Sequence, residues 1–192
     1  MTDLPSSYRP STFAAAHPDR PAVITGAGQV VTYAELEARS CRLAQALYAH
    51  GLRPGDCVAV VLPNDHRTHE VTWGLQRSGL YYTMVNAHLT AEEAAYIVND
   101  SGARVLITSD TLGRLAADLT DLTPHVDLRL LIAAAAAAGA PTGTPAHPRY
   151  VEYTDYDTFT SSHPAIPLEV ETEGSPMLYS SGTCLLYTSR CV

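Results

Sequence analysis

The sequence predicts an α/β fold with a doubly wound, mainly parallel layered sheet. Three features indicate this class. Strand-like and helix-like segments alternate along the chain, the connections between them are short, and several strand-like segments are continuous apolar runs. A continuous apolar run is typical of a strand that is covered on both faces. Short strand–helix–strand units imply parallel pairing through right-handed crossovers.

The first predicted element is a β-hairpin. Residues 21–25 and 29–32 are strand-like and flank Gly26-Ala27-Gly28, a glycine-rich turn. The two glycines also allow a dinucleotide-binding interpretation. That motif needs a third glycine and a buried strand-to-helix turn, and both are missing here. A hairpin is the better account of this segment.

Two capping boxes mark helix starts. Thr32 is followed three residues later by Glu35, and Thr90 by Glu93, so that each pair can satisfy the free amides of a first helical turn. The first helix is predicted to end near Gly51. The second is predicted to run to about Asp100, before Gly102. The predicted buried face of the first helix consists of Leu36, Ser40, Leu43 and Leu47.

The remaining elements follow in alternation. Buried strands are predicted at residues 58–62 and 104–108, a short strand at 81–85 and a further strand at 128–132. Asn64 or Asp65 can cap a helix that reaches about Ser78, and Ser109 or Asp110 can cap another.

The pattern weakens after residue 132. The alanine, glycine and proline run from 133 to 148 favours a surface loop. A short helix is predicted near 155–160, a loop from 163 to 173, and a strand at 176–179.

Composition excludes several functional classes. The net charge is −8 and the pI is near 5.4, which argues against a nucleic-acid-binding surface. All 12 basic residues are arginine. The chain lacks a secretory start and any run of about 20 apolar residues, so neither secretion nor a transmembrane segment is predicted. We therefore expect a cytoplasmic protein.

Histidine and cysteine give weak signals. His66 and His69 lie one helical turn apart, but their order does not match a zinc-protease motif, and a solvated first helical turn explains them better. Cys41 and Cys57 are expected to be small buried side chains rather than disulfide partners. No catalytic or metal-binding residue is predicted from these positions.

The strongest candidate site is Ser180-Ser181-Gly182-Thr183. The segment follows an apolar strand and offers hydroxyls, successive backbone amides and a glycine that lets a phosphate approach the main chain. This composition is common in loops, so the motif alone is weak.

A family resemblance strengthens this interpretation. The runs 31–36, 51–60 and 62–64 resemble the opening of AMP-forming acyl-CoA synthetases, or acid–CoA ligases, of the adenylate-forming superfamily. Residues 79–101 are similar to the branch that acts on fatty or related carboxylic acids. Residues 178–183 are similar to the start of the family's phosphate loop, and Cys184 departs from it. The resemblance covers nearly all of residues 13–183 apart from the alanine and proline loop.

The resemblance implies a two-step ligase reaction. A carboxylic acid substrate would attack the α-phosphate of ATP to give an acyl-adenylate, and coenzyme A would then displace AMP. Ser180, Ser181, Gly182 and Thr183 would contact ATP phosphates, with Mg²⁺ sharing the charge. The family's lysines lie beyond this part of the chain, so the chain itself is expected to be inactive. The sequence predicts neither the acyl chain length of the substrate nor the oligomeric state of the protein.

Two alternatives stay open. An adenylation domain of a peptide synthetase shares the loop and the fold, although residues 79–101 favour the CoA ligase. A non-catalytic α/β module that binds a phosphorylated ligand is the alternative from another class.

Residues 184–192 have the features of a non-native tail. One permitted back-translation, TGT CTC TTA TAC ACA TCT AGA TGT GTA, ends in an inverted repeat and resembles a transposon mosaic end used in sequencing libraries. We therefore expect an incomplete N-terminal adenylating domain over residues 1–183 and a sequencing-derived tail over 184–192. A chance apolar C-terminal strand is the alternative.

Overall fold

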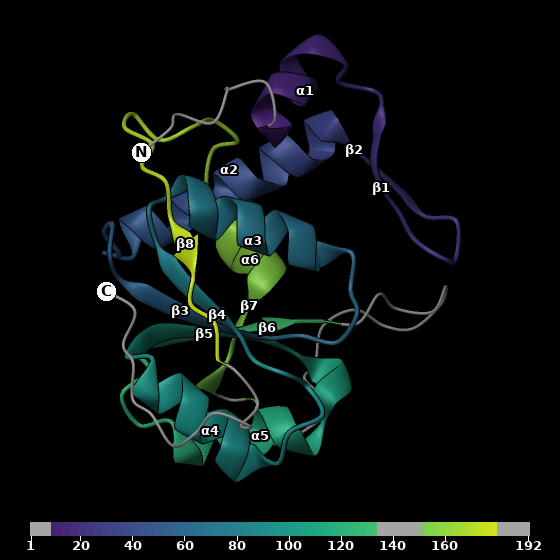
Figure 1. Cartoon of the computed structure of the whole chain (residues 1–192). Helices are drawn as coiled ribbons and strands as arrows, with labels where there is room; N and C mark the ends of the chain where they lie inside the picture. The colour runs from purple at the N-terminus through teal and green to yellow at the C-terminus, as the bar shows by residue number, and fades with distance from the viewer. Residues whose placement is uncertain (1–8, 134–149, 151, 180–192) are drawn as a thin grey trace.

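The computed structural model describes residues 9–133, 150 and 152–179. The elements are given in chain order in Figure 1. They are α1 (Pro10–Ala16), β1 (Pro21–Ile24), β2 (Val30–Thr32), α2 (Tyr33–Ala49), β3 (Cys57–Val61), α3 (Arg67–Arg77), β4 (Tyr81–Met84), α4 (Ala91–Asp100), β5 (Ala103–Ser109), the 3₁₀ turn η2 (Asp110–Leu112), α5 (Arg114–Leu122), β6 (Leu128–Ile132), β7 (Thr154–Asp155), α6 (Tyr156–Ser161) and β8 (Ser175–Pro176).

The main sheet has six strands in the order β7-β6-β5-β3-β4-β8, and every neighbouring pair is parallel. The chain starts in the middle at β3, moves to β4 on one side, and then crosses back to β5, β6 and β7 on the other. This is the doubly wound order in which the direction of winding reverses between β3 and β5. The predicted fold class is confirmed.

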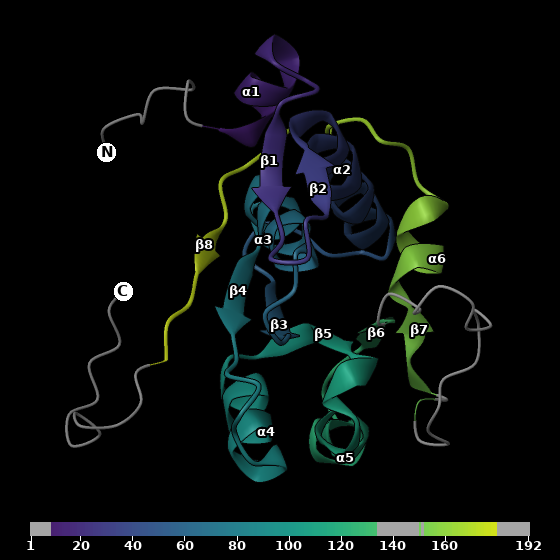
Figure 2. The ribbon, with the colours of Figure 1, turned by 90° about the vertical axis from the view of Figure 1, so that its right-hand side faces the viewer.

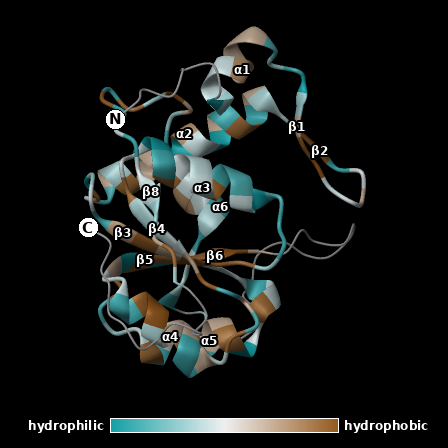
Figure 3. Ribbon diagram, viewed as in Figure 1, coloured by the Kyte–Doolittle hydropathy of each residue, from teal (hydrophilic) through white to brown (hydrophobic). Residues whose placement is uncertain are grey.

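Helices cover both faces of this sheet (Figures 1 and 2). α2, α3 and α6 lie on one face, and α4 and α5 lie on the other. Consecutive residues of β3 alternate between the two cores: Val58 and Val60 pack under α2 and α3, whereas Ala59 and Val61 face α4. All five residues of β3 are buried, as its uninterrupted apolar sequence predicts. Figure 3 shows the same apolar character along the central strands.

Both predicted capping boxes are present, whereas Ser109 caps the 3₁₀ turn η2 and the N-cap of α5 is Gly113. Thr32 and Glu35 exchange hydrogen bonds with each other's backbone amides at the start of α2, and Thr90 and Glu93 do the same at the start of α4. The whole predicted buried face of α2 is buried, namely Leu36, Ser40, Leu43 and Leu47. The cap predicted at Asn64 or Asp65 is wrong: α3 begins one residue later than expected, its N-cap is His66, which makes no side-chain cap bond, and Asp65 accepts the backbone N–H of Arg67 at 2.8 Å from just before the helix.

α1, β1 and β2 form a small N-terminal unit that packs against α2. β1 and β2 form the predicted antiparallel hairpin, with Gly28 in its turn at a φ of 83°. α1 was not predicted. It packs on α2 through Phe13, whose ring stacks on Tyr33 with 5.2 Å between the ring centroids.

The end of the described chain differs from the prediction. The strand expected at residues 176–179 is only Ser175–Pro176, followed by one further bond from the Met177 N–H to the Tyr82 carbonyl at 2.7 Å. β8 is the edge strand beside β4, so it gains pairing energy from one side only, and Leu178 is already 86% exposed. The predicted loop at 133–148 lies almost entirely outside the described residues. Among the residues described, no helix combines the length and the apolar character needed to cross a bilayer.

Candidate functional site

The sheet topology places the candidate site at the carboxyl ends of the central strands. In doubly wound sheets, ligands bind outside these ends, near the point where the winding reverses. Here that point lies between β3 and β5, whose carboxyl ends are joined by a bond from the Thr108 hydroxyl to the carbonyl of Val61, the last residue of β3, at 3.0 Å. Thr108 is fully buried. The loops that start at Leu62 and at Asp110 therefore leave the sheet from a fixed base.

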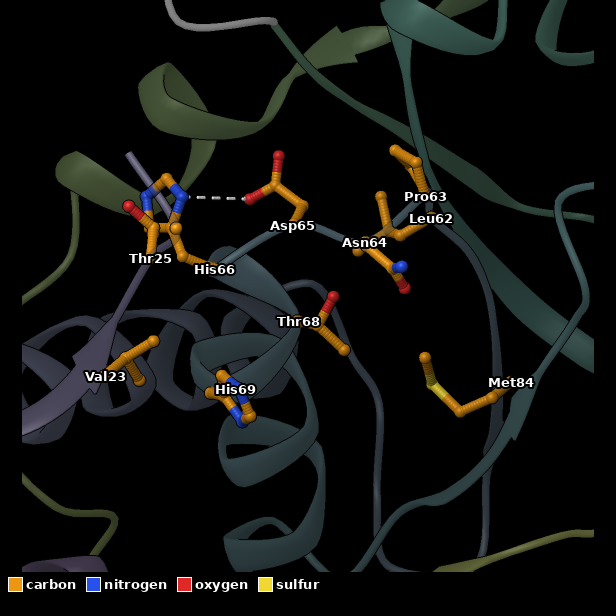
Figure 4. A pocket seen from close by; sticks show the side chains of 11 residues that line it. Val23, Thr25, Leu62, Pro63, Asn64, Asp65, His66, Thr68, His69 and Met84 are labelled. Atoms are coloured by element: carbon orange, nitrogen blue, oxygen red, sulfur yellow. Dashed lines mark ion pairs between the residues drawn. The ribbon is translucent and has the colours of Figure 1, made fainter. Parts of the chain in front are cut away.

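A pocket of about 480 Å³ opens at this edge, beside the start of α3. Figure 4 shows Met84 at the end of β4 opposite Val23 and Thr25 of the hairpin, with the first turn of α3 between them. The full lining is Val23, Thr25, Gly26, Leu62, Pro63, Asn64, Asp65, His66, Thr68, His69 and Met84. The pocket thus combines apolar walls with hydroxyl, amide and imidazole groups.

Asp65 organises the polar side of the pocket. Its Oδ1 atom accepts the Arg67 backbone N–H and lies 3.2 Å from His66 Nδ1. The carboxylate therefore satisfies one of the free amides at the start of α3 and orients the imidazole at the same time. Thr68 continues this turn by donating its backbone N–H to the Asp65 carbonyl at 3.1 Å.

This pocket by itself does not fit a triphosphate. None of its described lining residues is an arginine or a lysine, and the nearest fixed charge is the Asp65 carboxylate. A polyanion needs several cations or a cradle of backbone amides at close range. The lining is better suited to an uncharged group with both apolar and polar parts.

A second groove lies on the other side of His66, between α2, α3 and α6. Glu70 is buried in its floor, where the Arg39 guanidinium approaches it to 3.5 Å. Burial raises the pKa of Glu70, and the attraction of Arg39 and Arg67 only partly opposes this effect. Arg67 forms a bidentate ion pair with Asp157, with N–O distances of 3.0 and 2.9 Å. Arg39 and Arg67 are thus paired with acids, and Arg42 adds one further positive charge to the lining of this groove.

The predicted phosphate loop, Ser180, Ser181, Gly182 and Thr183, lies outside the described residues. The segment that leads to it is described. Met177 is half-buried and packs against the core between the sheet and α4, and the Tyr179 hydroxyl donates a 2.8 Å hydrogen bond to Asp100 at the end of α4. The assignment of phosphate contacts to residues 180–183 stays a prediction.

The weaker sequence signals have structural explanations. Gly26 and Gly28 belong to the hairpin turn. In the described part of the chain, no cluster of three or more histidine, cysteine, aspartate or glutamate residues could hold a metal ion, and His66 pairs with Asp65. Cys41 and Cys57 are buried free thiols. Burial is the main cause that raises the pKa of Cys41 to about 12, which removes the reactive thiolate.

Sequence reasoning missed the pocket residues that come from outside the β3–α3 connection. Val23 and Thr25 reach the pocket from the hairpin, and Met84 reaches it from the end of β4 on the opposite side. The position of Met84 at the end of a predicted strand was the available signal. The positions of Val23 and Thr25 carried none.

Comparison with known proteins decides the family. The profile of the family described as AMP-binding enzyme matches residues 11–184. The chain belongs to this family.

The curated relatives include both acid ligases and a peptide synthetase subunit. The chain is 35% identical over 128 residues to the fatty acid–[acyl-carrier-protein] ligase ScoC of Streptomyces coeruleorubidus, covering 66% of this chain and 24% of that protein. It is 30% identical over 145 residues to surfactin synthase subunit 3 of Bacillus subtilis, covering 74% and 11%. It is 39% identical over 94 residues to a feruloyl-CoA synthase of an Amycolatopsis species, covering 47% and 19%. The chain therefore spans a quarter or less of each of these relatives.

The fold is also that of a solved family structure. The anthranilate CoA ligase AuaEII in complex with anthranoyl-AMP superposes with a TM-score of 0.73 at 20% identity, covering 95% of this chain and 34% of that one. At this identity the likeness concerns the fold. The predicted family is thus confirmed at the level of AMP-binding enzymes, and it includes acid–CoA ligases and peptide synthetases alike.

Proposed function

We propose that the chain is the N-terminal part of an AMP-forming acid–CoA ligase, which activates a carboxylic acid, in particular a fatty acid, with ATP and transfers it to coenzyme A. The observation that carries the proposal is the family match over residues 11–184, which includes the Ser180–Thr183 element. Residues 79–101, similar to the fatty-acid branch, favour the CoA ligase. The ScoC and feruloyl-CoA synthase relatives point the same way.

In this proposal the described residues form the frame of the site and perform no chemical step. The joined ends of β3 and β5, and the bond from the Arg67 N–H to Asp65 at the start of α3, hold the edge of the sheet. Ser180, Ser181, Gly182 and Thr183 would contact the phosphates of ATP, and Mg²⁺ would share their charge. The lysines that this chemistry uses come from beyond the chain, since all its basic residues are arginine.

An adenylation domain of a peptide synthetase is the second candidate, because the surfactin synthase relative matches a larger share of this chain than the CoA synthase does. One assay separates the two. The full-length protein read from the native locus should exchange pyrophosphate into ATP with fatty or aryl acids and release a CoA thioester. Exchange with amino acids, without a CoA product, would favour the synthetase. Exchange with neither would overturn both.

We also propose that residues 184–192 are the non-native tail predicted above. The nucleotide record should then carry the inverted repeat at or beside the codon for Cys184. A smooth GC-rich coding sequence through Val192 would contradict this.

A further inference from the structure

The second groove, between α2, α3 and α6, has an unbalanced charge. Three arginines, Arg39, Arg42 and Arg67, face two acids, Glu70 and Asp157, so its charged side chains sum to +1 with the histidine neutral. None of the described lining residues is apolar. The volume of the groove is about 420 Å³, which is the size of a small-molecule site.

Both acids of the groove are engaged by an arginine. The carboxylate oxygens of Asp157 accept from Arg67 Nη1 and Nη2 at 3.0 and 2.9 Å, so the planar fork of Arg67 contacts both oxygens. Glu70 is buried, and the Arg39 Nη1 atom lies 3.5 Å from its Oε2 atom. Each acid is thus matched by one arginine, and the charge of Arg42 is left over.

Arg42 is half-buried on α2 and lines the groove. Among the residues that the structure describes, its guanidinium forms no ion pair and no hydrogen bond. The positions three and four residues away on α2 hold two alanines, Arg39 and Gln45, and none of these is an acid. Residues 134–149, outside the described ranges, contain no aspartate or glutamate either. The fork of N–H donors on Arg42 is therefore available to a ligand.

Arg39 can share the same anion. It precedes Arg42 by three residues, so the two side chains lie on one face of α2. Its nitrogens lie 3.7 Å from Glu35 and 3.5 Å from Glu70, beyond the distance of about 2.7–2.9 Å that is typical of a charge-assisted hydrogen bond. The two acids hold the guanidinium in place and leave N–H donors for a ligand.

Neutral polar groups complete the lining. The side-chain amide of Gln29, in the hairpin, forms no hydrogen bond with another described residue. Thr160 and Ser161 of α6 donate their hydroxyl protons to the carbonyls of Tyr156 and Thr158 in their own helix. Their oxygens can still accept hydrogen bonds. These groups suit the hydroxyl groups of a ligand.

We propose that this groove binds a small hydrophilic carboxylate, such as a hydroxy acid. Arg42 and Arg39 hold its carboxylate. Its hydroxyl groups bind Gln29, Thr160 and Ser161. The single charge of a carboxylate matches the net charge of the lining, and its planar shape fits the fork of an arginine. This binding is independent of the ligase reaction proposed above.

The experiment titrates the full-length protein with three six-carbon probes by calorimetry. Gluconate has one carboxylate and several hydroxyl groups, glucitol has the hydroxyl groups without the charge, and hexanoate has the charge without the hydroxyl groups. We expect gluconate to bind about tenfold or more tightly than either of the others, because each of them loses one set of hydrogen bonds. Failure of gluconate to bind at ~10 mM would overturn the proposal. Equal affinity for gluconate and hexanoate, or tighter binding of inorganic phosphate, would overturn it as well.

Arg42→Gln should weaken gluconate binding about tenfold or more, because the charge without a partner is lost. Arg42 has no described ion pair to lose, so the variant should fold as the unsubstituted protein does. Arg20→Gln is the matched control: the substitution is the same, and Arg20 is exposed and lies outside the described lining. It should bind gluconate as the unsubstituted protein does. Equal weakening in the two variants would show that only the overall charge of the protein attracts the anion, and would overturn the site.

Asp157→Asn should have the opposite effect. It frees the fork of Arg67 and raises the summed charge of the lining from +1 to +2. Gluconate should therefore bind about threefold tighter or more. The side chain of Asp157 is 57% exposed, so the substitution leaves the core intact. Unchanged or weaker binding in this variant would overturn the assignment of the carboxylate to the arginines of the groove.

Discussion

Gly74 of α3 lies directly against Leu43 of α2. A Cβ atom built on Gly74 would be 2.9 Å from Leu43 Cδ2 and 3.1 Å from the Ser40 carbonyl oxygen. The two helices can approach this closely only because position 74 has no side chain. Glycine in the middle of a helix costs about 1 kcal/mol relative to alanine, so the close packing must offset that cost.

Gly74→Ala should therefore destabilise the protein although alanine is the better helix former. Overpacking of a dense core costs about 1–3 kcal/mol, which exceeds the gain in helix propensity. We expect a net loss of about 1 kcal/mol, measured as faster exchange of the buried β3 amides in the full-length protein. Gly26→Ala is the matched control, because a Cβ atom there meets nothing within 4 Å and should be neutral. Equal protection in both variants would show that the helices can separate at no cost.

Thr90→Ala should loosen the start of α4. The Thr90 hydroxyl accepts the Glu93 backbone N–H at 3.3 Å, and Glu93 Oε2 accepts the Thr90 N–H at 2.9 Å. Loss of a helix cap costs about 1 kcal/mol. Thr90→Ser keeps the hydroxyl and should retain most of the stability. The melting temperatures of the two variants test this. The same melting temperature for both would show that the Thr90 hydroxyl does not stabilise the start of α4.

Glu70→Gln should raise stability at high pH and leave it unchanged at low pH. Burial raises the pKa of Glu70 above its ordinary value, against the opposing attraction of Arg39 and Arg67, with the Tyr156 hydroxyl facing the same carboxyl. A carboxyl whose folded-state pKa is raised contributes full stability below its unfolded pKa and loses it as pH rises through the folded value. A glutamine side chain does not titrate, so the Glu70→Gln variant does not lose this contribution to stability as the pH rises.

The melting temperatures of the two proteins should therefore agree near pH 4 and diverge as the pH approaches 8, with Glu70→Gln melting higher. A lower melting temperature for Glu70→Gln at pH 8 would mean that the Arg39 ion pair outweighs the cost of burying the charge.

Local signals made most of the fold predictable. The capping boxes at Thr32 and Thr90 and the buried run of β3 depend on neighbours within one helical turn or one strand, and the structure contains all of them. Helix α1 was missed because its sequence is short, and it depends on the packing of Phe13 on Tyr33. The length of β8 was overestimated because an edge strand depends on partners that its own residues do not encode.

The functional features were harder to predict from the sequence, because they too depend on contacts between residues that are distant in the chain. The Ser180–Thr183 loop was singled out by composition and family resemblance, and it stays a prediction. The contact between Arg67 and Asp157 joins residues 90 positions apart, and neither has a local pattern that would mark it. The pocket depends in the same way on Val23 and Thr25 of the hairpin, which are distant in the sequence from the other lining residues.

The last prediction concerns association of the chain by itself. The chain covers 34% of the solved CoA ligase with the same fold. In the described residues β8 pairs only with β4, and Leu178 is 86% exposed. An uncovered edge with apolar side chains is a template for pairing with another copy. We expect the isolated 192-residue chain to be molten or to associate, as measured by light scattering and dye binding. Leu178→Lys should reduce this association, because a charge on an edge opposes pairing, whereas Leu122→Lys on α5 should not. Cooperative unfolding of a soluble monomer with well-dispersed amide spectra would contradict the prediction and indicate that these residues form a self-sufficient domain.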